Sequence, residues 1–420
     1  MKILLKNILI QDINSKHHQE VKDILIENGL IIKIDNGITT KADSILEKEN
    51  ISASIGFVDI FSKIGEPGFE YNETLITASN AAQAGGFTRI FSLPNTHPTV
   101  STQSQINYIK EKSNSLPVFI HSLGAISKNI EGNTLAEMYD MFSNGAIAFS
   151  DGDTPIQSTV LMLKALQYVK AFNGIIVQMP LDKGFSKIGV MNEGIVSTTL
   201  GMPGIPELAE TLMIKRDIEL LKYAESKLHL TGVSTASGIE LITEAKKQGL
   251  QITCSVAPHH LLFCDEDIVD YNTNFKVDPP LRTRKDMMAL RMAVMNNEID
   301  CIACHHVPVH NDFKDCEFDR AANGMIHLQT VFAEINTALP ELSTTKLLAL
   351  FSYHPRTIFN LPIPKIEEGE QAEITLFNKE TEFTLTKENN KSKSSNSVLF
   401  NKNLKGKIIG TINKGKIFIN

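Results

Sequence analysis

Short apolar runs recur eight times through the middle of the chain, and this feature constrains the fold more than any other. The runs are rich in β-branched residues and are flanked by turn residues, which is typical of strands buried in a parallel sheet. They are Gly56–Phe61, Thr88–Leu93, Pro117–Leu123, Ala146–Ser150, Gly174–Met179, Leu228–Val233, Gln251–Val256 and Asp300–Cys304.

Between these runs, apolar residues recur every three or four positions, which predicts helices with one buried face. Eight strands that alternate with helices predict an α/β fold of the (β/α)8 TIM-barrel type, with a doubly wound open sheet as the alternative. In the last of these helices we expect Met287, Met288, Met292 and Met295 to be core residues. The helical segments are Glu73–Ala84, Thr154–Phe172, Pro206–Ser226, Ser237–Lys247 and Arg284–Met295.

Both ends of the chain contain strand patterns without helices. Near the start, Asn28 and Gly29 separate two such patterns and predict a tight hairpin turn. We therefore expect one small β-domain built from residues 1–52 and 362–420, beside a barrel that spans residues 53–361. Lys387–Ser397 is rich in Lys, Asn and Ser, which predicts an exposed loop.

Charge and composition exclude several classes of partner. The chain has 420 residues and a net charge of −7, with no basic block that would favour nucleic acid or an anionic membrane. No stretch approaches the roughly 18 apolar residues that a membrane span requires. The five cysteines form no disulfide framework, and their odd number favours a reduced, cytoplasmic protein.

In a barrel of this type, functional residues lie at the C-terminal ends of the strands. The chain carries a series of specific motifs at and around those ends, and through them it resembles the dihydroorotase family of the amidohydrolase superfamily over nearly its whole length. The matching segments are Gly56–Asp59, Glu66–Glu70, Ala84–Thr88, Pro94–Thr96, Val190–Gly194, Pro203–Pro206, Val233–Ala236, Pro258–Leu261, Asn274–Val277 and Pro279–Arg282.

The resemblance implies a barrel, a flanking β-domain from both termini, and two divalent metal ions that activate water and polarise the ring amide of dihydroorotate. In the family the ligands are a His-x-His pair at strand one, an acidic residue at strand four, histidines at strands five and six, and an Asp at strand eight that also moves the proton.

This chain departs from that pattern at five of the six positions. Only the acidic residue of strand four, Asp151, is kept, and His305 is the one replacement that can bind a metal. In chain order the six positions hold Phe61, Lys63, Asp151, Gln178, Gly232 and His305.

The positions that would bind substrate differ as well. The arginine that follows the His-x-His pair is replaced by Gly65, which removes a fork of donors for a carboxylate. The asparagine before the two prolines is replaced by Asp278, which would repel an anion, whereas Asn95 is kept. The last histidine of the strand-eight motif is replaced by Val309, although His310 follows it.

A rebuilt metal site is the competing interpretation of this region, because Cys301, Cys304, His305, His306 and His310 are potential ligands. The two cysteines lie three apart on a predicted strand, however, so their side chains should point to opposite faces. We expect His259 and His260 to be hydrogen-bonded framework residues of a retained motif.

The first functional hypothesis is therefore a non-catalytic dihydroorotase-like protein of pyrimidine biosynthesis, with no metal cofactor. Inactive members of the family associate with aspartate transcarbamoylase, so the resemblance implies that enzyme as a partner, and a homodimer. The alternative is an active dihydroorotase, or another cyclic-amide hydrolase, with a zinc site reduced to Asp151 and His305. Under the first hypothesis we expect Lys63 to pair with Asp151, and Phe61 to fill the volume that the metals would occupy. The alternative is that Lys63 extends into solvent and that backbone amides satisfy Asp151.

Overall fold

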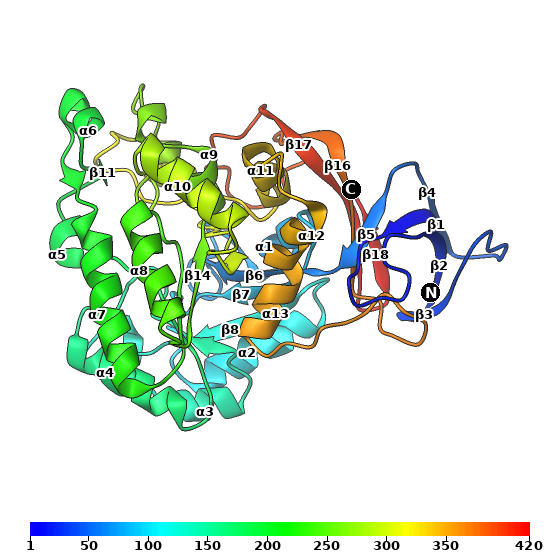
Figure 1. Ribbon diagram of the computed structural model, residues 1–420, viewed down its shortest axis with the longest axis horizontal. Helices are drawn as coiled ribbons and strands as arrows, with labels where there is room; N and C mark the ends of the chain where they lie inside the picture. Colours follow the sequence, from blue (N-terminus) through cyan, green and yellow to red (C-terminus); the bar gives the residue numbers. More distant parts are fainter.

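The computed structural model describes residues 1–420 and contains a barrel of eight parallel strands in sequence order (Figure 1). Each predicted strand overlaps one of them, so the barrel is confirmed. The ring closes where Lys63 donates its backbone N–H to the carbonyl of His306 at 2.8 Å. The strands are β6 (Phe57–Ser62), β7 (Phe87–Ser92), β8 (Phe119–Gly124), β9 (Ala148–Phe149), β10 (Ile176–Gln178), β13 (Leu228–Leu230), β14 (Ile252–Val256) and β15 (Cys301–Ile302).

Helices surround the barrel and bury their apolar faces against it (Figure 1). Several begin at a Ser or Thr whose hydroxyl accepts a first-turn amide, as at Thr235 and Thr283, which explains where the chain turns from loop to helix. The helices are α1 (Leu75–Ala84), α2 (Gln103–Asn114), α3 (Met138–Ser143), α4 (Thr159–Lys170), α7 (Leu208–Ala224), α8 (Ala236–Lys247), α10 (Arg284–Met295), α11 (Val331–Ala338), α12 (Thr344–Leu348) and α13 (His354–Ile358).

Several short helices and strands lie within the loops at the C-terminal ends of the barrel strands. They are α5 (Lys183–Ser186), β11 (Met191–Asn192), α6 (Ile195–Leu200), β12 (Gly204–Ile205) and α9 (Pro258–Leu262).

The two chain ends meet in one further sheet beside the barrel, to the right in Figure 1. Its strand order is β18-β17-β16-β5-β1-β2-β3, and β4 also pairs with β1. The predicted turn at Asn28 and Gly29 joins β2 to β3 with positive φ at both residues. The strands are β1 (Lys2–Ile10), β2 (Val21–Glu27), β3 (Leu30–Asp35), β4 (Ser44–Glu47), β5 (Ser52–Ile55), β16 (Ile374–Thr384), β17 (Asn403–Asn413) and β18 (Lys416–Ile419).

A buried cluster of charges ties this sheet to the barrel. Glu373, next to β16, accepts hydrogen bonds from Arg89 of β7 at 2.9 Å through each carboxylate oxygen. It also pairs with Arg356 of α13, which is fully buried, and accepts a hydrogen bond from Thr88 at 2.7 Å. One carboxylate therefore joins the C-terminal strand segment to two separate parts of the barrel.

The prediction that Lys387–Ser397 is an exposed loop is confirmed only in part: the segment is a loop and Lys387, Glu388, Lys391 and Lys393 are exposed, but Ser392, Ser394, Asn396 and Ser397 are buried. Its polar side chains pack onto the barrel: Ser392 and the Lys393 amide donate to the Glu73 carboxylate. Asn396 is buried and bonds both the carbonyl of Val307 and the amide of Val309. Ser and Asn side chains here form hydrogen bonds with loop backbone that has no partner in a sheet. Amino-acid composition alone does not distinguish such a packed loop from one that is exposed to solvent.

The expectation that all four α10 methionines are core residues is wrong for two of them. Met287 is buried and Met295 packs against the main core, but Met288 and Met292 are about half exposed. These two occupy the outer side of α10.

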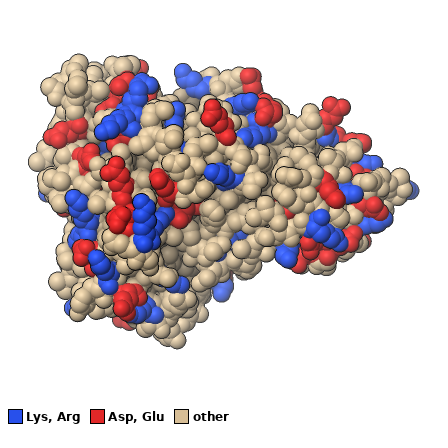
Figure 2. Space-filling model, viewed as in Figure 1, with Lys and Arg blue, Asp and Glu red and all other residues tan.

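No helix of the structure is long and apolar enough to cross a bilayer. Acidic and basic side chains are interspersed on the face that Figure 2 shows, without a block of one sign.

Candidate functional site

A cavity of about 360 Å³ opens at the C-terminal ends of the barrel strands. Four of the residues singled out from the sequence line it, namely Lys63, His259, Asp278 and His305. Asp151, Gln178, Gly232 and Asn95 are not among its lining residues. The cavity is lined by Lys63, Asp153, Thr154, His259, Val277, Asp278, His305, Val307, Ala322, Asn323, Gly324 and Met325.

Phe61, on β6, and His305, just after β15, pack against each other. Their rings stack at 4.4 Å between centroids with an angle of 27°, and both residues are buried. His305 also bonds the hydroxyl of Thr231 through Nε2 at 2.9 Å. Burial holds the pKa of His305 well below its usual value, so the ring is neutral. The Phe61 ring thus covers one face of a potential metal ligand.

The predicted pair between Lys63 and Asp151 is wrong, because Lys63 pairs with Asp153 at 2.5 Å. Asp151 turns away from the cavity and accepts hydrogen bonds from the amides of Ile126, at 2.8 Å, and Ser127, at 3.0 Å, and from the Ser127 hydroxyl. Burial raises the pKa of Asp151 to about 6, and the bonds from Ser127 oppose that rise. Backbone amides therefore satisfy Asp151, as the alternative expected, although Lys63 pairs with Asp153 and does not extend freely into solvent.

Two further positions are adapted to structural roles. Gln178 is buried, and its side-chain amide bonds both the amide and the carbonyl of Ile156 at 3.3 Å. Gly232 has φ of +69°, and a Cβ there would lie 2.5 Å from Cε1 of His305. The His305 ring therefore occupies the space into which a side chain at position 232 would project.

The replacement at position 65 is equally restrictive. A Cβ on Gly65 would lie 2.2 Å from the carbonyl oxygen of Phe69. The backbone at position 65 therefore leaves no room for a larger side chain that could reach the cavity. Asn95 is kept, and its side-chain amide donates to the carbonyl of Asp151 at 3.1 Å. That contact holds two strand ends together.

Comparison with known proteins gives a consistent result. The model of the dihydro-orotase-like family matches residues 53–237. A dihydroorotase from Syntrophus aciditrophicus is 36% identical over 99% of both chains, and one from Caldicellulosiruptor saccharolyticus is 38% identical over 99% of this chain and 98% of its own. The chain belongs to the dihydroorotase family. The structure is also similar to an L-hydantoinase from Arthrobacter aurescens, with a TM-score of 0.85 and 20% identity over 100% of this chain and 96% of that one, which supports the fold.

The residues present do not fit the metal pair that the family implies. Phe61 offers no donor atom, Gly232 offers no side chain, and the Lys63 ammonium is itself a cation. The Gln178 amide is engaged by backbone, and the acceptor atoms of Asp151 are taken by three donors. No group of three or more His, Cys, Asp or Glu side chains is arranged to hold a metal ion.

The other potential ligands do not rebuild such a site. Cys301 and Cys304 are both buried in separate apolar clusters, in agreement with their predicted opposite faces. His310 lies near the surface beside Asp312, at 3.4 Å. His260 bonds the carbonyl of Pro279 at 3.0 Å, which is the framework role expected of it.

The sequence did not reveal a buried array behind the cavity. Nδ1 of His259 lies 3.0 Å from Nε2 of His327, whose Nδ1 lies 3.0 Å from both oxygens of Glu334. His327 and Glu334 are seven residues apart around the start of α11, and this spacing is typical of two residues on one helix face. Nothing in the sequence indicated that His259 lies next to them.

We expect the Lys63–Asp153 pair to contribute little to stability, because both side chains are about 30% exposed. The Lys63→Met variant should change the free energy of unfolding by no more than about 1 kcal/mol in urea titrations. Asp153→Asn serves as the matched change on the other partner. A loss above about 3 kcal/mol in both variants would show that the pair acts as a buried one.

Proposed function

We propose that this chain is a cytoplasmic, dihydroorotase-like protein of pyrimidine biosynthesis that does not hydrolyse dihydroorotate and acts through its contacts with other chains. The observation that carries the proposal is the state of the barrel mouth. Phe61 stacks on His305, Gly232 leaves no room for an imidazole, and Asp151 accepts three hydrogen bonds from Ile126 and Ser127. These contacts stabilise the fold and leave no set of ligands that could activate water.

Aspartate transcarbamoylase is the partner that we propose, since inactive members of this family associate with it. A homodimer is proposed as the unit that binds it. The retained family motifs support this view, because the barrel and both chain ends keep their architecture while the mouth has changed. Fold alone does not fix a partner, so the association needs a direct test.

Catalysis remains the competing function, and the dihydroorotase names of the relatives favour it. In that case Asp151 and His305 would hold a single zinc ion. The geometry is less favourable for such a zinc site. His305 lines the cavity, whereas the Asp151 carboxylate is not part of the lining and binds Ile126 and Ser127.

We expect the chain to co-elute with aspartate transcarbamoylase of the same organism in size-exclusion chromatography, at a mass that neither protein has alone. Deletion of the gene should reduce the amount of assembled transcarbamoylase. Asp278→Asn, a change inside the cavity, is a matched control that should leave assembly intact. If transcarbamoylase keeps its size and activity without this chain, the proposed role is wrong.

A further inference from the structure

Two cavities of about 360 Å³ each adjoin at the barrel mouth and share a wall. The inner cavity is the one lined by Lys63, Asp153 and His305. The outer cavity lies on the side of α5 and β12 and is lined by Lys183 and Lys187. The shared wall consists of Thr154, Val277, Asp278 and Asn323.

The inner cavity is lined by more carboxylates than ammonium groups. Its lining contains Asp153, which pairs with Lys63 at 2.5 Å, and Asp278, whose partner Lys183 lies in the outer cavity. The Asp278 side chain is half-buried, at 17% exposed. A charged group that enters this space is therefore favoured if it is a cation that donates hydrogen bonds.

An unpaired acceptor on the inner wall points to the same kind of ligand group. His259 lines the cavity, is 2% exposed, and has no partner at Nε2. The Glu334 carboxylate fixes a proton on Nδ1 of His327, so with one proton on each ring His327 accepts from Nδ1 of His259. This leaves a lone pair on Nε2 of His259, and a buried acceptor without a donor is costly.

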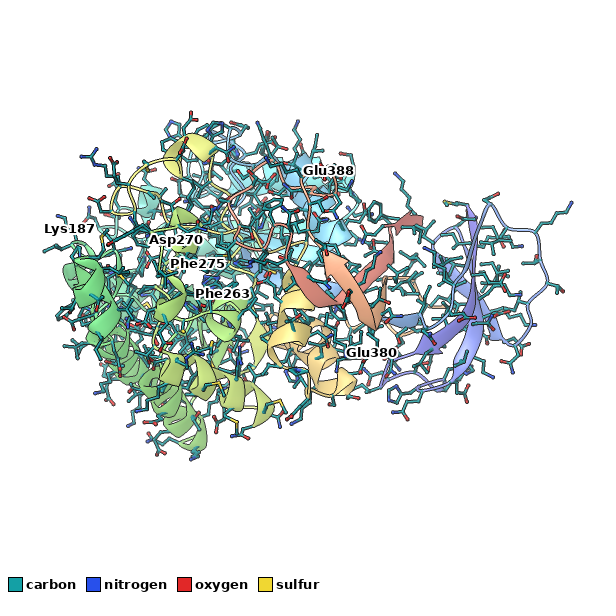
Figure 3. The ribbon with its side chains drawn as sticks, turned by 90° about the horizontal axis from the view of Figure 1, so that it is seen from above. Lys187, Phe263, Asp270, Phe275, Glu380 and Glu388 are labelled. Atoms are coloured by element: carbon teal, nitrogen blue, oxygen red, sulfur yellow. The ribbon has the colours of Figure 1, made fainter.

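The outer cavity has the opposite charge. Lys183 lies 3.3 Å from Asp278 and Lys187 has no carboxylate within ion-pair distance. Figure 3 shows Lys187 at the outer end of the barrel, away from the β-domain. Across the wall at Asp278, the lining thus changes from an acidic interior to a basic rim.

We propose that the mouth binds a small dipolar molecule of the amino-acid class, with its ammonium group inward and its carboxylate outward. The ammonium would contact Asp278 and Asp153 and donate toward His259. The carboxylate would lie near Lys183 and Lys187. Ion pairs with charged donors on both ends fix the orientation of such a ligand.

The positions that differ from the family support this polarity. At Gly65 the carbonyl of Phe69 leaves no room for a guanidinium stem, so no arginine enters the cavity from this position. Asp278 adds a carboxylate at the shared wall. Without a guanidinium at position 65 and with a carboxylate at position 278, the lining suits an inward ammonium group better than an inward carboxylate.

The test uses three compounds with the same four-carbon chain: 4-aminobutyrate, n-butylamine and butyrate. Binding to the full chain is measured by isothermal titration calorimetry. We expect 4-aminobutyrate to bind at least about tenfold more tightly than either compound of single charge, since each end adds a charged hydrogen bond.

Variants assign the two ends. Asp278→Asn should weaken 4-aminobutyrate and n-butylamine by about tenfold, and Lys187→Gln should weaken 4-aminobutyrate but leave n-butylamine unchanged. Lys416→Gln, on the exposed β18 strand, is the control that should change nothing. If Asp278→Asn does not fold by circular dichroism, Asp153→Asn tests the same end.

Two results would overturn the inference. One is butyrate binding as tightly as 4-aminobutyrate, with Asp278→Asn increasing its affinity. The other is the absence of any heat of binding for 4-aminobutyrate at about 10 mM, a concentration that detects Kd values of a few millimolar.

Discussion

Glu373→Gln should lower the free energy of unfolding by about 3–5 kcal/mol, because it leaves the buried Arg356 and the half-buried Arg89 with a neutral partner. Arg356 is fully buried and Arg89 bonds both oxygens of this carboxylate. Glu370→Gln, three residues away and exposed, is the matched control and should change stability by less than about 0.5 kcal/mol. Urea denaturation at neutral pH gives both values.

The same carboxylate makes stability depend on pH. Burial alone would raise the pKa of Glu373, but Arg356 and Arg89 outweigh burial and lower the pKa to about 2. Because the pKa of Glu373 is lower in the folded state than its unfolded value near 4.5, the ionised carboxylate stabilises the fold at pH values above about 4.5. This contribution is lost as the pH falls from about 4.5 to about 2. The loss should be much smaller in Glu373→Gln. Equal acid sensitivity in both proteins would show that Glu373 is not the responsible group.

Gly232→Ala should cost about 2–4 kcal/mol. Part of the cost is the positive φ of +69°, which is worth about 1–2 kcal/mol for an L-residue, and the rest is the overlap with His305. Gly249→Ala isolates the first part, because Gly249 has φ of +82° and no other group lies within 4 Å of the position that its Cβ would take. It should therefore cost only about 1–2 kcal/mol.

A double-mutant cycle tests the steric part directly. In Gly232→Ala combined with His305→Ala, the total loss should be smaller than the sum of the two single losses by about 1 kcal/mol or more. Additive losses would mean that the His305 ring does not occupy the space above Gly232. This outcome would weaken the explanation for why no imidazole is present at position 232.

The barrel could be predicted from the sequence because its strands are buried on both faces and their apolar runs are short and well separated. The β-domain was predictable for a similar reason, through the Asn28-Gly29 turn and the strand patterns at both ends. The exposed methionines Met288 and Met292 were not, because Met suits core and surface alike.

At the mouth, the sequence identified which positions had changed, but it could not assign their new contacts. Lys63 is long enough to reach more than one carboxylate, and only the folded loops bring Asp153 within 2.5 Å while Ser127 turns to Asp151. The packing of Ser392 and Asn396 onto the barrel was hidden for a similar reason, because polar side chains that satisfy loop backbone have the composition of a solvated loop.

The metal content and the dihydroorotase activity of the purified protein test the central claim most directly. The protein is expressed with added zinc, its metal content is measured by mass spectrometry, and opening of dihydroorotate is followed in the same preparation. Because Phe61, Lys63, Gln178 and Gly232 supply no ligand for a divalent cation, we predict far less than one zinc ion per chain and no hydrolysis above the uncatalysed rate. One or two zinc ions per chain, with a hydrolase activity that a chelator abolishes, would contradict this account.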